Sequence, residues 1–521
     1  MFALVSGLLL ALSFPKFGFP AFGWIALAPL LVALSGWRGD AGPVRGQPPL
    51  RAFLLGLIAG WIYFAGTVYW TADVVRTFGG LAPPVAMFGM MMLALYLALF
   101  PAVSAWLTAM LIRRAGLRGL LLFPCAWVAT EYWRGTFIMG GFPWVPLGNS
   151  QVTMLPVAQL ASVFGVYGLS ALVAIVNALV ACALLSSGRR RTVFVTAAVL
   201  TPLVCAAGGA WRIGDGTLLR SGRTQTVGLV QANIDQESKW RGGDAPRIFA
   251  THLAITRDVA ERGAKLVLWP ESSLPRFNGE LQRAAALQEL QALVRELDVH
   301  VLYGADELIG GSTSYNSAFL MGPDGNTLAV YRKIHLVPFG EFIPYGDWLA
   351  FFPPLVETLG GFAPFAPGTE VVMLPLNGAQ ASTAICYEVV YPSLIATAVR
   401  QGSQLLTTIT NDGWYGTSSA PFQHFEMASM RAIEQGRYLV RAANTGISGI
   451  VDPYGRVVER SPIFKEAGIV GEVRLLSDRT IYSRLGDVVA FASIGIMGVS
   501  ALLVRVGQPK GNRRQKVGDR R

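Results

Sequence analysis

The stretch Ser382-Thr-Ala-Ile-Cys-Tyr-Glu388 places a cysteine at the end of a short run of residues that is typical of a buried strand. Pro392 lies just beyond it, and proline is common in the first turn of a helix. Strands that alternate with helices form α/β domains, whose ligand sites lie beyond the carboxyl ends of the strands. The stretch therefore predicts an α/β fold with Cys386 at such an edge, where the entrance of a helix favours the thiolate.

Two other stretches place reactive side chains near the ends of predicted strands. They are Leu266-Val-Leu-Trp-Pro-Glu271 and Tyr331-Arg-Lys-Ile-His-Leu-Val-Pro-Phe-Gly-Glu341. A carboxylate can take the proton of a thiol, the thiolate can attack a carbonyl, and an ammonium with a backbone N–H can stabilise the oxyanion. Each residue alone also has a plainer explanation: Glu271 as an acid at a helix N-terminus, Lys333 as a solvated strand end and Cys386 as core.

The segment between residues 214 and 487 alternates β-branched runs with helical patterns. This alternation predicts a sheet covered by helices, in one large domain with its own core. The expected strands are Val227–Ile234, Leu266–Trp269, Val301–Tyr303, Ser382–Ile385, Leu405–Thr410 and Ile447–Val451. The expected helices are Ala245–Arg262 and Leu281–Leu297.

The rest of the chain is too apolar for a wholly soluble enzyme. Charged residues make up 14% of the sequence, against about 25% in soluble proteins. A run of about 20 apolar residues can cross a membrane as a helix. Eight spans are expected: Phe2–Phe14, Phe19–Ser35, Phe53–Trp70, Met87–Ile112, Leu120–Met139, Val166–Leu185, Thr192–Trp211 and Val488–Val504.

Lys and Arg are distributed unevenly around these spans. The net charge is +11, and residues 1–212 contain 13 Lys and Arg against 3 Asp and Glu. A basic total can indicate a nucleic-acid partner, but these residues flank apolar runs and are better explained as orientation charges. Sixteen of the 43 Lys and Arg residues of the whole chain follow the second, fourth and sixth spans or lie in the tail: Arg38, Arg45, Arg51, Arg113, Arg114, Arg118, Arg189, Arg190, Arg191, Arg505, Lys510, Arg513, Arg514, Lys516, Arg520 and Arg521.

This asymmetry predicts the orientation of the chain. Cytoplasmic loops are enriched in Lys and Arg, so both termini are expected in the cytoplasm. The predicted organisation is a seven-span membrane domain over 1–212, an outer domain over 213–487, a final span over 488–504 and a basic tail over 505–521. In a bacterium the outer domain would lie in the periplasm.

Three features inside the predicted domains leave alternatives open. Gly56 and Gly60 are spaced for helix packing, although chance explains the spacing equally well in a glycine-rich chain. Glu131 and Arg134 are either functional or a mutual pair at the outer interface. Cys386 is the only cysteine of the outer domain, because Cys125, Cys182 and Cys205 fall in expected spans. Such a lone thiol is either buried and inert or reactive.

The reactive stretches belong to an ordered set of five motifs. They are Gln231-Ala-Asn-Ile-Asp-Gln-Glu-Ser-Lys-Trp240, Trp269-Pro-Glu271, the segment from Tyr331 to Pro344, Cys386-Tyr-Glu388 and Asn411-Asp-Gly-Trp-Tyr-Gly416. This set resembles the Glu–Lys–Cys triad of the nitrilase (carbon–nitrogen hydrolase) superfamily. Together with the spans, it is similar to the apolipoprotein N-acyltransferase family of bacterial inner membranes, over essentially the whole chain.

The resemblance implies a role for each residue of the site. Glu271 is expected to be the base, Lys333 the oxyanion stabiliser and Cys386 the nucleophile. Glu341 would be a second carboxylate that steadies the site. Trp240, Tyr387 and Glu388 would be supporting or substrate-binding residues. The pattern gives His335 and His424 no acid–base role, and it implies no metal and no cofactor.

The resemblance also implies a fold, a reaction and partners. The expected fold is a polytopic helical membrane protein with eight transmembrane helices and an inserted periplasmic α/β nitrilase-like domain, an αββα sandwich. The expected reaction moves the sn-1 acyl chain of a phospholipid such as phosphatidylethanolamine, through a cysteine thioester, to the α-amino group of an S-diacylglyceryl apolipoprotein. Two rivals remain: a membrane-tethered amidase or nitrilase for a small C–N substrate, and a transporter or receptor with an inert Cys386.

The stretch Trp348–Phe365 is highly apolar but is broken by proline and glycine. One hypothesis is a mobile lid that dips into the membrane above the site. The alternative is a loop packed on the core of the domain.

Overall fold

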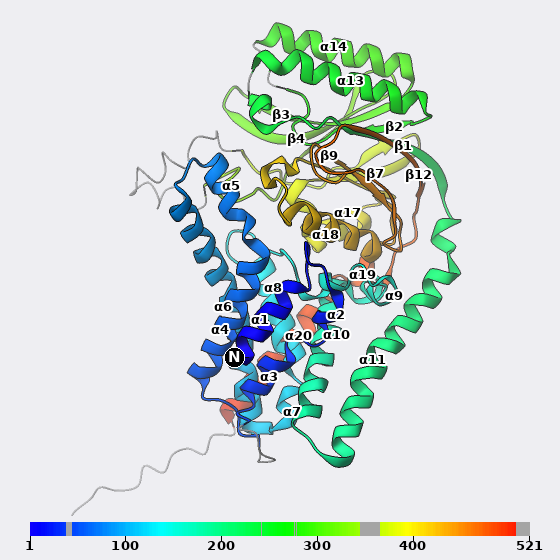
Figure 1. Ribbon diagram of the computed structural model, residues 1–521. Coiled ribbons are helices and arrows are strands. Elements are labelled where there is room, and N and C mark those ends of the chain that lie inside the picture. The colour runs from blue at the N-terminus through cyan, green and yellow to red at the C-terminus, as the bar shows by residue number, and fades with distance from the viewer. Residues whose placement is uncertain (38–43, 241, 276, 278, 344–364, 507–521) are drawn as a thin grey trace, which may run out of the picture.

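The computed structural model describes residues 1–37, 44–240, 242–275, 277, 279–343 and 365–506 (Figure 1). The stretch Trp348–Phe365, for which one hypothesis was a mobile lid, lies outside the described residues apart from Phe365. The basic tail beyond residue 506 lies outside them as well.

Two six-stranded sheets form the centre of the α/β part. The first sheet has the order β12 (Ala467–Leu475), β1 (Arg223–Gln231), β2 (Leu266–Leu268), β3 (His300–Ile309), β4 (Thr313–Met321) and β5 (Thr327–Arg332). The second has the order β11 (Val457–Arg460), β10 (Gly449–Val451), β9 (Leu439–Ala443), β8 (Leu405–Thr410), β7 (Ala379–Ile385) and β6 (Leu374–Leu376). Strands β1, β2 and β3 pair in parallel, as do β7, β8 and β9, and the outer pairings are antiparallel.

The two sheets pack face to face, with a layer of helices on each outer face. Leu229 and Leu268 of the first sheet share one buried cluster with Ile385 and Ile409 of the second. The helices of the first outer layer are α13 (Ala245–Glu261) and α14 (Glu280–Leu297), and those of the second are α17 (Pro392–Arg400) and α18 (Ala420–Gln435). The result is an αββα sandwich, as the resemblance implied.

Every expected strand and helix of the sandwich is present. The sequence pattern did not predict β4, β5, β6, β9, β11, β12 or α18. Most of these strands pair antiparallel with a sequence neighbour, so hairpin pairing and not an apolar run defines them. The boundary expected at residue 212 falls inside a helix that continues to Asp215.

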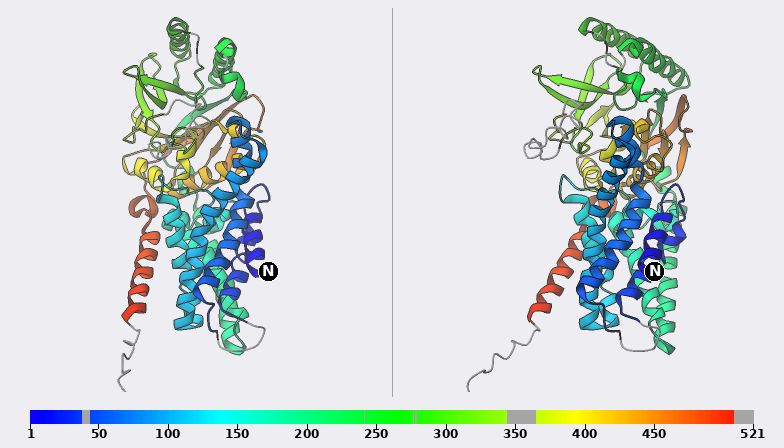
Figure 2. Two further views of the ribbon diagram at one scale, coloured as in Figure 1. Left: turned by 90° about the vertical axis from the view of Figure 1, so that its left-hand side faces the viewer. Right: turned by 60° about the vertical axis from the view of Figure 1, so that its left-hand side comes forward.

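A bundle of apolar helices lies below the sandwich (Figure 2). Its helices are α1 (Phe2–Leu12), α2 (Pro20–Gly23), α3 (Ala28–Leu34), α4 (Pro49–Val68), α6 (Pro83–Ala115), α7 (Leu117–Leu120), α8 (Phe123–Thr136), α9 (Leu155–Ala158), α10 (Ala161–Leu184), α11 (Gly188–Asp215) and α20 (Val488–Val506), the last joined to the sandwich through α19 (Ile481–Leu485). Helix α5 (Trp70–Phe78) follows α4 and stands beside the sandwich (Figure 1). In the described ranges, four helices are long and apolar enough to cross a membrane: α4, α6, α10 and the segment that contains α11. The other four predicted spans coincide with shorter helices, so the count of eight stays a prediction.

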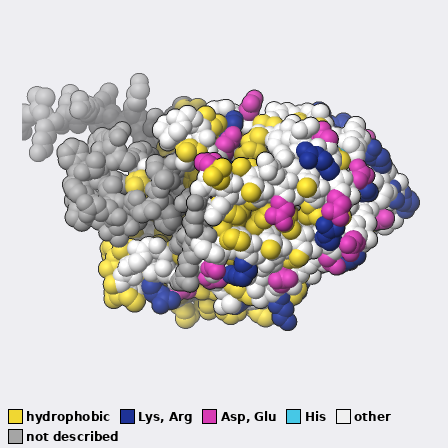
Figure 3. Space-filling model, turned by 90° about the horizontal axis from the view of Figure 1, so that it is seen from above, with side chains coloured by type: hydrophobic (Ala, Val, Ile, Leu, Met, Phe, Trp, Pro, Cys, Tyr) yellow, Lys and Arg dark blue, Asp and Glu magenta, His cyan; other side chains and the backbone are white. Residues whose placement is uncertain are grey.

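The two ends of the molecule have different surfaces. Seen from above, the outer end of the sandwich carries interspersed Lys, Arg, Asp and Glu side chains (Figure 3). Helix α11 instead exposes apolar side chains such as Val204 and Trp211. This division matches a water-facing sandwich on a lipid-facing bundle.

Gly56 and Gly60 of α4 do form a packing face. A Cβ atom at Gly56 would lie 2.6 Å from Ala105 Cβ and 2.7 Å from the carbonyl oxygen of Pro101, both on α6. Gly60 approaches Ala98 of α6 in the same way. The two helices therefore touch backbone to backbone, which only glycine permits.

We expect Gly56→Ala to destabilise the bundle, because overpacking a tight contact costs about 1–3 kcal/mol. Gly89→Ala on α6 is the matched control, since a Cβ there has open space around it. Alanine also favours a helix over glycine by about 0.5–1 kcal/mol, so this control should be neutral or slightly stabilising. Thermal unfolding of the detergent-solubilised protein measures both, and equal melting temperatures for the two variants would contradict the expectation.

Glu131 and Arg134 of α8 both bind the loop that follows this helix. Glu131 Oε1 accepts a hydrogen bond from the Leu147 amide at 2.7 Å. Arg134 donates to the carbonyl oxygens of Phe142 and Trp144 at 2.8 and 2.7 Å. The two charged residues therefore hold this loop against α8.

Candidate active site

The sandwich brings the three predicted catalytic side chains together. Glu271 follows β2, Lys333 follows β5 and Cys386 follows β7, so two come from the first sheet and one from the second. Lys333 Nζ lies 3.2 Å from Glu271 Oε1 and 2.8 Å from Oε1 of Glu341. The Cys386 thiol lies close enough to the Glu271 side chain for each group to shift the pKa of the other. All four predicted residues therefore form one buried cluster.

Both carboxylate oxygens of Glu271 accept hydrogen bonds. Oε1 accepts from Asn316 Nδ2 at 2.8 Å and from Lys333, and Oε2 accepts from the Asn411 amide at 3.0 Å. Asn316 Nδ2 also donates to Glu341 Oε1 at 2.8 Å, and Glu341 Oε2 accepts from the Val337 amide. This network fixes the orientation of both carboxylates around the Lys333 ammonium.

The charges of the cluster follow from its burial and its pairings. Burial raises the pKa of Glu271, but the Lys333 charge and the hydrogen bonds of Asn316, Lys333 and Cys386 outweigh it, so this pKa lies below its usual value. Burial lowers the pKa of Lys333, but Glu271 and Glu341 raise it above the ordinary range. Glu271 therefore rests as a carboxylate and Lys333 as an ammonium.

The expected bias of Cys386 toward the thiolate is wrong. Burial raises the pKa of its thiol, and the negative charge of Glu271 raises it further, against the opposing effect of Lys333. Cys386 begins the short 3₁₀ turn Cys386–Val390 and not α17, so it lies away from the start of that helix. Cys386 therefore rests as a thiol beside a carboxylate, which is an arrangement that suits activation of a thiol by a general base.

Glu388 connects the lysine segment to the cysteine strand. Its Oε1 accepts from the Ile334 and His335 amides at 2.6 and 3.1 Å and from Tyr331 Oη at 2.8 Å. Its Oε2 accepts from the Ile385 amide at 2.8 Å. Burial raises the pKa of Glu388 to about 7, although these backbone donors lower it. Glu388 therefore ties the segment after Lys333 to the end of the strand that precedes Cys386.

Tyr387 faces the loop that follows α8. Its hydroxyl donates to the Gly141 carbonyl oxygen at 3.4 Å, and its ring stacks on Trp144 with centroids 6.3 Å apart. Tyr391 donates to the same carbonyl at 3.0 Å. The turn of the nucleophile therefore rests directly on the membrane part of the chain. The side chain of Trp240 lies outside the described residues.

Comparisons with known proteins cover both halves of the chain. Residues 226–478 match the carbon-nitrogen hydrolase family, and residues 6–179 match the apolipoprotein N-acyltransferase N-terminal domain. A relative named apolipoprotein N-acyltransferase from Geobacter metallireducens is 39% identical over 97% of this chain and 95% of its own length. The chain belongs to the apolipoprotein N-acyltransferase family. A second relative of that name, from Methylococcus capsulatus, is 34% identical over 96% of this chain and 95% of its own.

A solved amidase from Nesterenkonia sp. also resembles part of this family member. It is 21% identical, covers 53% of this chain and 97% of its own, and has a TM-score of 0.40.

The structure adds two residues to the site that sequence reasoning missed. Asn316 of β4 bridges both carboxylates, as described above. Lys239 of α12 (Gln236–Trp240) is buried, and its Nζ lies 3.3 Å from the Glu271 carbonyl oxygen. Lys239 stands inside a motif of the resemblance, beside Trp240, which was the available signal. Asn316 stands in a polar run that is typical of a solvated hairpin, so no local pattern distinguishes it.

Lys239 gives the stability of this protein a specific pH dependence. Burial lowers the pKa of Lys239 to about 8, although Glu271 and Asp306 raise it, whereas an unfolded lysine titrates near 10.4. Between these values the unfolded chain binds more protons, so stability should rise with pH. We expect the free energy of unfolding of the wild type, minus that of Lys239→Met, to rise by about 3 kcal/mol from pH 7.5 to 10.5.

Chemical denaturation of the solubilised protein at each pH measures this difference. Lys265→Met is the matched control, because Lys265 is exposed and pairs with exposed Asp298, and its difference should stay flat. Parallel pH profiles for the wild type and Lys239→Met would rule out the effect.

The two histidines without an expected role occupy different surroundings. His335 stacks on Tyr391 with ring centroids 4.0 Å apart, and burial lowers the pKa of His335. His424 is fully buried beneath Cys386. Within the described ranges, no group of three or more His, Cys, Asp or Glu residues is arranged to hold a metal ion.

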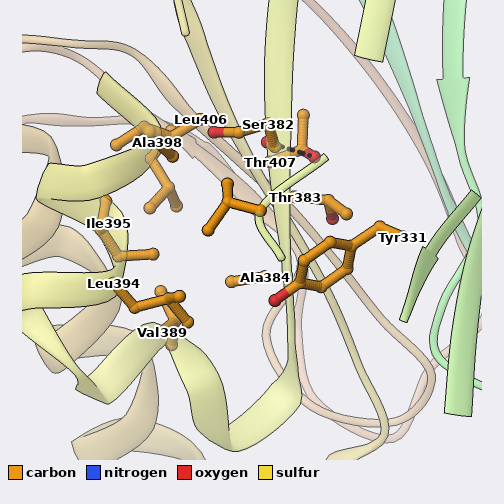
Figure 4. Close-up of a pocket in the computed structure, with 12 residues that line it drawn as sticks. Tyr331, Ser382, Thr383, Ala384, Val389, Leu394, Ile395, Ala398, Leu406 and Thr407 are labelled. Atoms are coloured by element: carbon orange, nitrogen blue, oxygen red, sulfur yellow. Dashed lines mark hydrogen bonds between the residues drawn. The ribbon is translucent and has the colours of Figure 1, made fainter. Parts of the chain in front are cut away.

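A small cavity lies behind the strand of the nucleophile, between β7 and α17 (Figure 4). It is lined by Ser382, Thr383 and Ala384 of β7 and by Ile395 of α17, and Tyr331 closes one side. Its volume of about 10 Å³ is at most enough for a single water molecule. The cavity is therefore a packing defect of the core and not a substrate site.

Proposed function

We propose that the protein transfers the sn-1 acyl chain of a phospholipid to the α-amino group of the N-terminal S-diacylglyceryl cysteine of an apolipoprotein. Membership of the apolipoprotein N-acyltransferase family supports this activity. One observation carries the chemistry: a buried ammonium shared by two carboxylates, next to a buried thiol. Cys386 is the proposed nucleophile, Glu271 the base, Lys333 the oxyanion stabiliser and Glu341 the second carboxylate.

The first step forms an acyl-enzyme. Glu271 takes the Cys386 thiol proton as Sγ attacks the ester carbonyl carbon of the phospholipid. Lys333 and the amide of Tyr387 stabilise the oxyanion that results. The intermediate then collapses, the bond to the glycerol oxygen breaks, and that oxygen takes the proton from Glu271. A lysophospholipid leaves, and the acyl chain stays on Cys386 as a thioester.

The second step uses the same groups in the opposite direction. The α-amine of the apolipoprotein attacks the thioester, and Glu271 accepts its proton. The carbon–sulfur bond breaks, the proton returns to Cys386, and an N-acylated lipoprotein leaves. Glu271 and Lys333 are nearly inaccessible to water, with 7% and 1% of their side chains exposed. Burial of this kind protects a thioester from hydrolysis.

The proposed location follows from the substrates and the charges. Both lipids are anchored in a membrane, so the catalytic part needs to stand on it. We place residues 213–487 in the periplasm of a bacterial inner membrane and both termini in the cytoplasm, because the loops predicted on the cytoplasmic side carry most of the basic residues. Trp144 and Gly141, which contact Tyr387, lie in the loop after α8 and support a site at the membrane surface.

The rival amidase reading has less support. A triad of this kind could hydrolyse a small C–N substrate, but such a substrate does not explain the apolar bundle. The relatives carry the name apolipoprotein N-acyltransferase, which names an apolipoprotein as the acceptor. This chain matches these relatives over nearly its full length.

Intact mass measurement after incubation with phosphatidylethanolamine tests the proposal. We expect an adduct of the mass of one acyl chain on the wild type, discharged by a diacylated lipopeptide. Cys386→Ala should show no adduct, whereas Cys205→Ala, which removes a thiol of α11, should behave as the wild type. An active preparation without an adduct, or an adduct that survives in Cys386→Ala, would overturn the proposal.

A further inference from the structure

Three buried polar side chains lie directly beneath the nucleophile. His424 comes from α18, Asp412 from the 3₁₀ turn Asp412–Tyr415, and Arg441 from β9. All three side chains are inaccessible to solvent. His424 Nε2 lies 3.1 Å from the carbonyl oxygen of Cys386. The cluster therefore contacts the backbone of the residue whose side chain reacts.

The partners of His424 decide which ring nitrogen carries the proton. A carbonyl oxygen can only accept, so Nε2 needs to carry a hydrogen in order to bond Cys386. Nδ1 lies 3.0 Å from Arg441 Nη2, which can only donate, and 3.0 Å from Asp412 Oδ1. Asp412 already pairs with Arg441 at 2.9 Å and accepts from Thr410 Oγ1 at 3.1 Å. A neutral ring with its proton on Nε2 donates to Cys386 and lets Nδ1 accept from the Arg441 guanidinium. Asp412 Oδ1 then receives no hydrogen from the ring and is held by Thr410 and Arg441 instead.

The electrostatic surroundings agree with a neutral ring. Burial lowers the pKa of His424 and the Arg441 charge lowers it further, although Asp412 raises it. Burial raises the pKa of Asp412, but the charge and hydrogen bond of Arg441 lower it, and this pKa lies below its usual value. The stable charge pair is therefore Asp412 with Arg441, and His424 is the neutral donor that this pair orients.

The hydrogen bond to Cys386 determines how the nucleophile turn is oriented. Cys386 has a φ of +53°, a left-handed conformation that costs energy for any residue other than glycine. Its peptide bond to Tyr387 is planar, so the Cys386 carbonyl and the Tyr387 N–H point in opposite directions. Anchoring the carbonyl on His424 therefore aims the Tyr387 N–H away from His424.

The ring of His424 is also held from the membrane side. Trp144 of the loop after α8 lies over it, with ring centroids 5.6 Å apart and planes tilted by 38°. Trp144 Nε1 donates to Gln423 Oε1 at 2.7 Å, which fixes the residue next to His424. His424 is thus clamped between the Asp412–Arg441 pair and an aromatic side chain of the bundle.

We propose that His424 is a positioning residue, which holds the Cys386 carbonyl through its Nε2–H and thereby sets the left-handed turn and the direction of the Tyr387 N–H. Arg441 and Asp412 select the tautomer that makes this bond. His424 transfers no proton in the reaction, because its only hydrogen is committed to the backbone. The effect of His424 on the reaction rests on the proposed function, whereas the assignment of its proton to Nε2 does not depend on that function.

Two variants of His424 distinguish the effect of its hydrogen bond to the Cys386 carbonyl from the effect of the ring filling its space in the core. His424→Phe keeps a planar ring but removes the donor, and His424→Gln places an amide N–H near the position of Nε2. We expect His424→Phe to lower kcat for thioester formation by about 100-fold with little change in KM, because a small misplacement of reacting groups costs this much. His424→Gln should recover most of the loss. Equal activity of the phenylalanine variant and the wild type, or equal inactivity of both variants, would overturn the proposal.

A second measurement uses the wild-type protein, so it does not depend on whether a variant folds. The chain has four histidines, so ¹⁵N-histidine NMR of the full-length protein in detergent can resolve the tautomer of each. We expect His424 to be neutral, protonated at Nε2, and unchanged between pH 6 and pH 9. A ring protonated at Nδ1, or a charged imidazolium at pH 7, would refute the proposal even if no acyl adduct ever forms. Absence of the adduct with the expected tautomer would instead contradict the proposed function alone.

Discussion

Lys333→Met should abolish acyl transfer and also destabilise the protein. Lys333 lies between Glu271 and Glu341 and pairs with both, and its side chain is 1% exposed. Methionine would remove the ion-pair partner of buried Glu271 and of partly buried Glu341, and breaking a buried pair costs about 3–5 kcal/mol. The oxyanion would lose a donor as well, which lowers kcat by about 10²–10³. We therefore expect a large loss in both quantities from one substitution.

Thermal unfolding and the rate of acyl-adduct formation measure the two effects. Lys265→Met is the matched control, because the Lys265–Asp298 pair is exposed and such pairs contribute about 0–1 kcal/mol. A third readout separates chemistry from folding: without the Lys333 charge, which lowers the pKa of Cys386, alkylation of the thiol by iodoacetamide should require a higher pH. A Lys333→Met protein with wild-type melting and turnover would exclude Lys333 from the site.

Glu271→Gln should reduce turnover by about 10²–10⁴, the contribution of a general base. The amide can accept from Asn316 and Lys333 through its oxygen, but its NH₂ group would then face the Asn411 amide, which also donates. That conflict costs about 1–3 kcal/mol, so the fold should survive at reduced stability. Glu296→Gln, at an exposed pair with Arg257, is the matched control and should change neither activity nor melting by much.

The sign of the thiol titration distinguishes a base from a structural carboxylate. The negative charge of Glu271 raises the pKa of Cys386, so its removal should move iodoacetamide alkylation to lower pH. Glu271→Gln would then hold a more acidic thiol and yet be far less active, because no group accepts the proton during attack. If alkylation does not shift, or if turnover survives the substitution, Glu271 is not the base.

Local sequence patterns predicted the parts of the site that end apolar strands. Glu271 and Cys386 each follow a run whose composition identifies it as a strand, and the structure confirms β2 and β7 there. Patterns failed where pairing partners are distant. Asn316 and Arg441 come from two separate elements, and nothing in their own neighbourhoods distinguishes a buried hydrogen-bonding role from a solvated one.

The protonation states could not be predicted either. A thiol near a helix suggested a thiolate, but burial and the charge of Glu271 reverse the direction of its shift. No sequence motif gave His424 a role in the reaction, so it was interpreted as structural. Its contact with the Cys386 backbone exists only after α18 and β9 pack beneath the 3₁₀ turn Cys386–Val390. These properties depend on the sum of all neighbouring charges and on solvent exclusion, and both are set by packing.

The sequence by itself determined the α/β class and the apolar bundle, because strand composition and apolar run length are local properties of the chain. The roles proposed for Glu271, Lys333 and Cys386 came from the resemblance of the ordered motifs to a family. Only the tertiary structure decided that one ammonium serves two carboxylates, that Glu388 ties the lysine segment to the cysteine strand, and that Trp144 and His424 clamp the nucleophile turn. Each of these contacts joins segments far apart in the chain. Their geometry follows from the face-to-face packing of two sheets on a membrane bundle.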